Sequence, residues 1–163
     1  MTLFTVLLFV HVLGAIIAFG PSFAFSIIGA MGGKEPMHAN FALRVTHRIA
    51  HGLLWPLALL QGLTGIGLFL TIPGGIDLTK VFWLDVAVVL YLFALGFSYF
   101  VQTPGLVKLI EMSSTPPPPP APGAAPSGPP PEFMALVKRV QQGGMVLGLL
   151  VVVIVFLMVT KPF

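Results

Sequence analysis

Long apolar stretches recur four times in this chain, and each reaches the roughly 20 apolar residues that a helix needs to cross a bilayer. Only 8% of the residues are charged, whereas a typical soluble domain carries about 25%. We therefore predict an all-α fold, in which one domain of 163 residues forms a bundle of four transmembrane helices. The expected spans are residues 2–31, 41–71, 81–102 and 134–160.

Prolines and glycines mark where these spans bend or end. Pro21 predicts a kink in the first span, because it cannot donate to the carbonyl of Ile17. Pro104 and Gly105 predict that the third span ends or bends there, followed by a short amphipathic piece, 106–112, that lies along the membrane surface. Residues 113–131 are rich in proline, which predicts a disordered, extended linker rather than part of the core.

The basic residues are divided unequally between the two ends of the predicted bundle. Lys80 and Lys161 belong to one end, and six others belong to the end that holds the proline-rich loop. Because cytoplasmic loops carry an excess of Lys and Arg, we expect both termini outside and the 113–131 loop in the cytoplasm. The expected location is a bacterial plasma membrane. The six are Lys34, Arg44, Arg48, Lys108, Lys138 and Arg139.

Four polar side chains form a stripe at the start of the second span. Arg44, His47, Arg48 and His51 are separated by steps of three and four residues, so a helix would place them on one face. One interpretation is contact with lipid phosphates. The other is a pocket for haem propionates, a phosphate or a quinone head group, in which Arg48 and His51 would be the main contacts.

A second polar layer is predicted nearer the termini. At about 1.5 Å per residue, His11, Gln61 and Asp85 lie roughly 12, 15 and 6 Å from the outer ends of their spans, so they could meet. Asp85 should need a partner, because an unpaired charge is costly in hydrocarbon, and His11 is the expected one. The pair could simply hold two helices in register, or His11 could serve a ligand, a proton relay or a quinone.

Histidines in a membrane bundle also raise the possibility of haem b. His11 and His51 would lie nearly 20 Å apart along the membrane normal, too far for both to ligate one iron. Haem ligation by a single histidine, His11, stays open. A metal site at His47 and His51, with His38 as a third ligand, is a further alternative.

The pattern Leu8-Phe-Val-His11-Val-Leu-Gly-Ala15, with Arg44 and Arg48 at the start of the next span, resembles a bacterial family of integral membrane proteins, domain of unknown function 2269. It is more distantly similar to the copper-resistance CopD domain and to HemJ-type protoporphyrinogen oxidases. These are helical membrane bundles with a histidine in an early span. The resemblance implies that His11 is the first-span histidine, and the HemJ-type relatives would imply haem b.

Several classes of function are disfavoured by what the chain lacks. There is no cysteine, which excludes disulfides and iron–sulfur clusters, and no catalytic triad, phosphate loop or zinc motif is present. We expect no nucleic-acid partner, and a binding protein rather than an enzyme. The first hypothesis is a redox-linked module that binds haem b or a quinone. The alternative is an accessory subunit without its own cofactor, which packs against other membrane subunits or itself.

Overall fold

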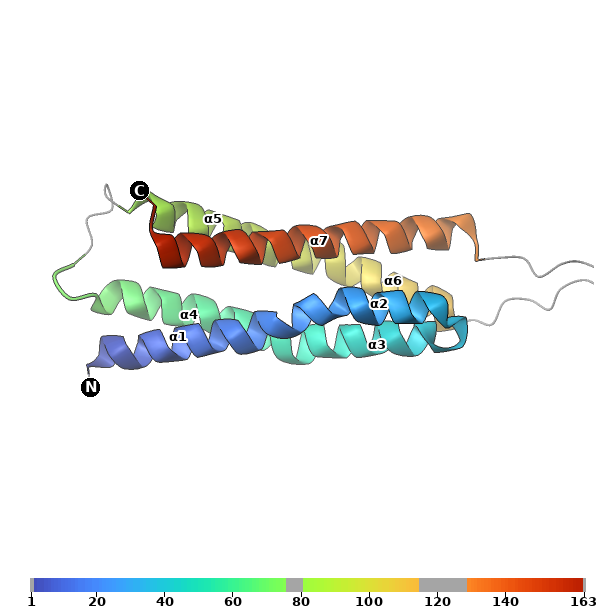
Figure 1. Ribbon diagram of the computed structural model, residues 1–163, viewed down its shortest axis with the longest axis horizontal. Coiled ribbons are helices and arrows are strands. Elements are labelled where there is room, and N and C mark those ends of the chain that lie inside the picture. The colour runs from blue at the N-terminus through green and yellow to red at the C-terminus, as the bar shows by residue number, and fades with distance from the viewer. Residues whose placement is uncertain (1, 76–80, 115–128, 163) are drawn as a thin grey trace, which may run out of the picture.

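The protein is an elongated bundle of four long helices, as the apolar stretches predict (Figure 1). The computed structural model describes residues 2–75, 81–114 and 129–162. The four candidate spans contain 32, 36, 33 and 30 residues, so each is longer than the hydrocarbon core of a bilayer requires. They run over Leu3–Lys34, Pro36–Thr71, Phe82–Ser114 and Pro131–Thr160.

Three of the four spans consist of α-helices joined by short turns of different pitch. The first contains α1 (Leu3–Phe19), a 3₁₀ turn (Gly20–Ala24) and α2 (Phe25–Lys34). The second contains a 3₁₀ turn (Pro36–His38), α3 (Ala39–Ile49), a π-helical turn (Ala50–Leu54) and α4 (Trp55–Thr71). The third contains α5 (Phe82–Phe97), a π-helical turn (Ser98–Gln102) and α6 (Thr103–Ser114). The fourth is one helix, α7 (Pro131–Thr160).

Of the two outcomes predicted at Pro104 and Gly105, an end or a bend of the third span, the end does not occur. The helix continues through a π-helical turn into α6 and ends only at Ser114, so residues 106–112 extend the span instead of lying flat. Pro104 is the second residue of α6 and directly follows the π-helical turn and Thr103. The Ser98 carbonyl accepts both the backbone N–H of Thr103 and, at 2.9 Å, the Thr103 hydroxyl.

The other span boundaries shift by a few residues, and Pro21 acts as expected. The first and second spans extend toward each other to Lys34 and Pro36, and the fourth begins at Pro131 instead of 134. Pro21 lies in the 3₁₀ turn that interrupts the first span. Most of the predicted linker, 115–128, lies outside the described residues, as do residues 76–80.

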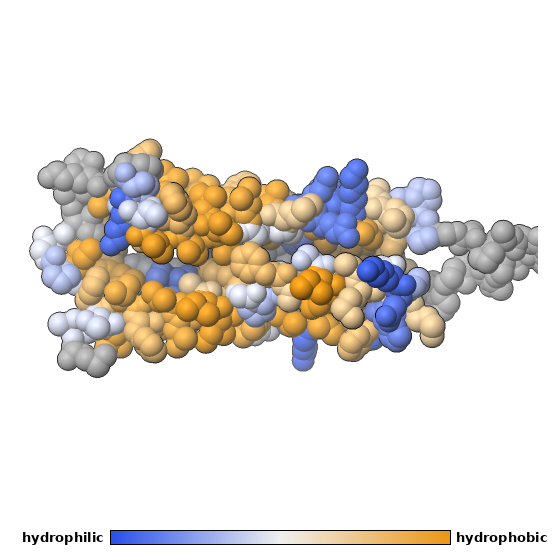
Figure 2. Space-filling model, in the orientation of Figure 1, coloured by the Kyte–Doolittle hydropathy of each residue, from blue (hydrophilic) through white to orange (hydrophobic). Residues whose placement is uncertain are grey.

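The helices pack differently toward the two ends of the bundle. Toward the end that holds both termini, α1 packs against α4 and α5 packs against α7 (Figure 1). We call this the terminal half. Toward the other end α3 packs between α2 and α6, and α6 also contacts the first part of α7. We call this the basic half, because Figure 2 shows hydrophilic residues gathered over it and hydrophobic ones over the terminal half.

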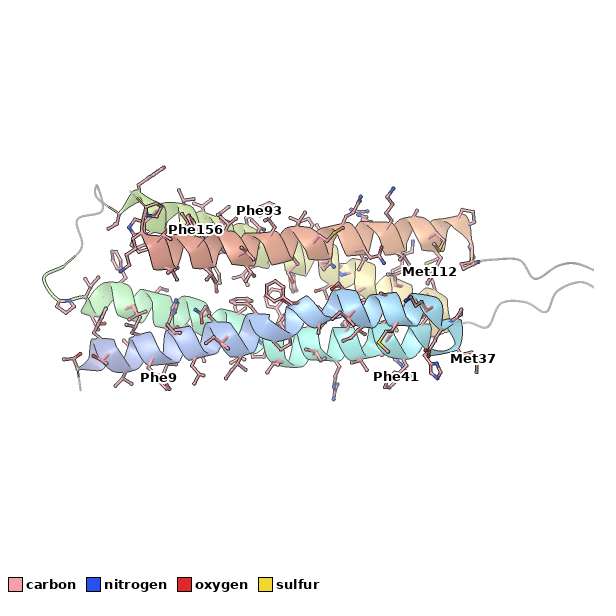
Figure 3. The ribbon with its side chains drawn as sticks, in the orientation of Figure 1. Phe9, Met37, Phe41, Phe93, Met112 and Phe156 are labelled. Carbon is pink, nitrogen blue, oxygen red and sulfur yellow. The ribbon has the colours of Figure 1, made fainter. Side chains whose placement is uncertain are left out.

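Small residues make the closest helix contacts. Ala18 and Ala87 are fully buried, and Ala58 is nearly so. Large side chains instead point outward, among them Phe9 on α1, Phe41 on α3 and Phe156 on α7, each more than half exposed (Figure 3). This arrangement is typical of helices in lipid, where apolar side chains can remain outside and small residues let backbones approach.

Candidate functional site

The first polar cluster joins α1 to α4 in the terminal half. His11 Nδ1 lies 2.8 Å from the Thr64 hydroxyl, and Thr64 is itself buried. The same hydroxyl can donate back to the carbonyls of Leu60 or Gln61, at 3.0 and 3.1 Å. Because the hydroxyl has one proton and three such neighbours, the tautomer of His11 decides whether the ring or the hydroxyl donates, and in either case Nδ1 is engaged with Thr64.

Glycines make room for this cluster. A Cβ at Gly65 would lie 3.4 Å from His11 Cε1, and a Cβ at Gly14 would lie 3.0 Å from Gln61 Oε1. That Gln61 oxygen is buried and has no hydrogen-bond partner among the described residues. His11 and Gln61 therefore do lie in one layer, pressed between two closely packed helices.

Asp85 does not pair with His11. Asp85 is exposed in the first turn of α5, and within the described residues it makes no hydrogen bond or ion pair, whereas His11 is held by Thr64. Counting residues along a span gives the depth of a side chain in the membrane but not its direction around the helix axis. The sequence therefore could not show that Asp85 points away from His11. Thr64 could have been found, since it follows Gln61 by one three-residue step on the same helix face.

The second cluster surrounds a groove between the second and third spans. This groove has a volume of about 350 Å³ and its lining is mostly apolar. The rings of Trp55 and Tyr99 meet there edge to face, with their centroids 5.6 Å apart. The lining residues are His51, Trp55, Pro56, Leu59, Tyr99 and Thr103. We call it the His51 groove.

Each of the two spans that border this groove has a π-helical turn beside it, and each turn supplies one lining residue. Ala50–Leu54 and Ser98–Gln102 each end two residues before a proline, Pro56 in one span and Pro104 in the other. A π turn inserts an extra residue per turn and so rotates the side chains that follow it. Such turns are frequent at functional sites. Here they contribute His51 and Tyr99 to the lining.

The rest of the basic stripe lies outside the His51 groove. Arg44 and Arg48 are exposed and form no ion pair with any described residue. His47 stacks on His51, with ring centroids 5.8 Å apart and planes at 29°. His38 instead contacts Glu35 at 3.1 Å. In the part of the chain that the structure describes, no three metal-ligating side chains converge.

Several groove residues were not singled out from the sequence. Trp55, Pro56, Leu59 and Thr103 are ordinary residues of apolar stretches, and nothing in their spacing marks them. The one available indication was the Trp55-Pro56 pair, which lies about one helical turn after His51, because a proline within a span disturbs the regular α-helical hydrogen bonds.

Comparisons with known proteins identify the family but assign no function. No curated protein and no solved structure matches the chain significantly. The model of one family, predicted integral membrane proteins with domain of unknown function 2269, matches residues 5–162. Nearly the whole chain is covered, so this protein belongs to the domain of unknown function 2269 family of integral membrane proteins.

Proposed function

We propose that this protein is a membrane binding module that takes up the head group of a lipid-soluble quinone in the His51 groove. The observation that carries this proposal is the groove itself, about 350 Å³ between two π-helical turns. That volume lies at the lower end of the range of small-molecule sites, about 300–1,000 Å³. A quinone head group needs only such a space, since its isoprenoid tail stays among the lipids.

The side chains around the groove suit this ligand chemically. A quinone ring is flat and apolar, so it can lie against the rings of Trp55 and Tyr99, and its two carbonyl oxygens need hydrogen-bond donors. His51, Trp55 and Tyr99 carry N–H and O–H groups that donate to no other described residue. Thr103 is less available, because its proton already goes to the Ser98 carbonyl.

Haem b at His11 is less well supported by the surroundings of that residue. Its ring lies against Gly65 and is held by Thr64, between helices that meet at Gly14. The Nε2 atom is left for an iron, as in most metal-ligating histidines, but neither described groove includes His11. The residues around His11 therefore fit a helix-to-helix hydrogen bond better than a porphyrin.

The proposed setting is a bacterial plasma membrane with both termini outside the cytoplasm. Both termini lie at one end of the bundle (Figure 1), and the six basic residues named for the opposite end all belong to α2, α3, α6 or the first part of α7. The positive-inside rule then places the basic half on the cytoplasmic side. A quinone in the His51 groove would lie near that side of the membrane.

The two tryptophans provide a direct test. Trp55 lies in the groove, whereas Trp83 lies on α5 with Lys161 over its ring at 5.8 Å. In detergent-purified W83F, a short-chain quinone should quench Trp55 fluorescence saturably. In the matched variant W55F, Trp83 should show only the weak linear quenching that comes from partitioning. Equal linear quenching in both variants would exclude the site.

Variants of the donors sharpen the test. In the W83F background, H51A and Y99F should each weaken quinone binding by about tenfold, the loss expected for one hydrogen bond of about 1.4 kcal/mol. H11A should leave it unchanged. A b-type absorbance spectrum of the purified protein, lost in H11A, would instead support the haem hypothesis.

An accessory-subunit role is favoured by a different observation. Gly29 and Gly33 are four residues apart on α2, and a Cβ at either would meet no atom within 4 Å. Small residues at this spacing are typical of helix contacts in membranes. If a second membrane protein packs there, G29L should release a co-purifying subunit, whereas G148L, at another open glycine, should not.

A further inference from the structure

A second groove lies between the third and fourth spans and shares no lining residue with the His51 groove. Its volume is about 150 Å³. Apolar side chains, including Phe100, Pro104, Leu136 and Val140, form most of the lining, and one charged residue, Arg139, completes it. We call it the Arg139 groove.

Arg139 lies at the level of the lipid head groups. The part of α7 that follows it, 140–160, carries no charge and is about 30 Å long at 1.5 Å per residue, the thickness of the hydrocarbon core. Lys161 marks the opposite boundary of this uncharged stretch. The Arg139 groove therefore opens where phosphates of the basic-half leaflet would be.

Arg139 is exposed and forms no ion pair within the described part of the chain. The nearby cation Lys108 differs, because its ammonium group lies 2.9 Å from a Glu132 oxygen. Gln102, also in the lining, is engaged too, since its amide nitrogen donates to the Val140 carbonyl at 2.8 Å. Arg139 is thus the group in this groove that remains available to an anion.

We propose that the Arg139 groove binds one anionic phospholipid, with the lipid phosphate on the Arg139 guanidinium. A guanidinium can donate two parallel hydrogen bonds to a phosphate. The groove, at about 150 Å³, is many times larger than the space that one water needs, so a phosphate group fits in it. The acyl chains remain in the bilayer against the apolar lining. Basic pockets between transmembrane helices bind anionic head groups in this way.

Native mass spectrometry of the detergent-purified protein, titrated with phosphatidylglycerol, tests this proposal. The wild-type protein should retain one phosphatidylglycerol tightly and phosphatidylcholine much more weakly. R139Q should weaken the first binding step by about tenfold or more, the loss of a charge-assisted hydrogen-bond pair. L136W, which fills the groove without changing charge, should weaken it similarly. Glycerol 3-phosphate should not bind, because it lacks acyl chains.

A matched control separates a defined site from general attraction to anions. Arg44 is also an exposed, unpaired arginine, but it lines neither described groove. R44Q should therefore change the first binding step by less than about twofold. Equal losses in R44Q and R139Q, or unchanged binding in both R139Q and L136W, would overturn the proposal. The quenching of Trp55 fluorescence by a quinone should be unchanged when R139Q is added to W83F. The two proposed sites can therefore be tested independently of each other.

Discussion

The terminal half and the basic half of the bundle are held together by different interactions. In the terminal half the contacts are alanine and glycine surfaces and hydrogen bonds between neutral groups, such as His11 with Thr64 and Tyr91 with the Ala58 carbonyl. In the basic half they include an asparagine that bridges two spans and a Lys–Glu pair.

The difference follows from the two solvents around the molecule. Within hydrocarbon there is no hydrophobic force between helices, so stability depends on close packing and on hydrogen bonds that satisfy each polar group. Beyond the hydrocarbon, water and head groups solvate charges. An ion pair there has a small desolvation cost and contributes little to stability. Substitutions in the two halves should therefore differ in the size and in the kind of their effects.

The largest effect is expected at Gly62 in the terminal half. A Cβ there would lie 2.7 Å from the Tyr91 hydroxyl, which donates to the Ala58 carbonyl at 2.7 Å and links α5 to α4. G62V should lower the free energy of unfolding by about 1–3 kcal/mol, because overpacking displaces Tyr91. Unfolding in SDS-containing mixed micelles measures this.

Gly148 provides the matched control for Gly62. It is also a glycine of a transmembrane helix, but a Cβ there would meet nothing within 4 Å. G148V should change the free energy of unfolding by less than about 0.5 kcal/mol, as surface substitutions do. Similar losses in G62V and G148V would show that close packing does not distinguish these positions.

An intermediate and local effect is expected at Asn40 in the basic half. Its amide nitrogen lies within 3.1 Å of the Ile110 carbonyl and of two hydroxyls, Ser113 and Ser114, so it ties the start of α3 to the end of α6. N40A should cost about 1 kcal/mol. Amide exchange should rise in the last turn of α6 and stay unchanged in α1 and α4, and a uniform rise would contradict a local role.

The smallest effect is expected for the Lys108–Glu132 pair. Both side chains are well exposed, 56% and 70%, although their charged atoms lie 2.9 Å apart. A double-mutant cycle with K108A and E132A should give a coupling free energy below about 1 kcal/mol that decreases with salt. A larger, salt-independent coupling would mean that this half is packed as tightly as the terminal half.

Much of the fold could be predicted from the sequence, because a bilayer leaves few choices. Four apolar stretches of this length must be helices, since every backbone polar group in hydrocarbon needs a partner. The exception was Pro104, where the third span was predicted to end or bend and where the helix continues to Ser114. A proline need not end a helix in a membrane, where local changes of pitch can accommodate it, and here a π-helical turn lies directly before Pro104 and leads into α6.

The candidate sites were less predictable. His51 was a candidate from the sequence and lines one groove, whereas Trp55 and Leu59 were not recognised. The sequence suggested Asp85 as the partner of His11, and the structure places Thr64 there. The depth of a side chain in the membrane can be counted from the sequence. The direction in which it points around the helix axis also depends on π-helical turns and on the packing of neighbouring helices.

The sequence by itself determined the helical class, the four membrane spans, the family and the unequal distribution of basic residues, because each depends on composition and order alone. Only the tertiary structure decided which polar groups meet and where grooves remain. Those outcomes depend on contacts between residues far apart in the chain, such as His11 with Thr64, Trp55 with Tyr99, and Gln102 with Val140. They arise when helices pack to a distance set by their small residues.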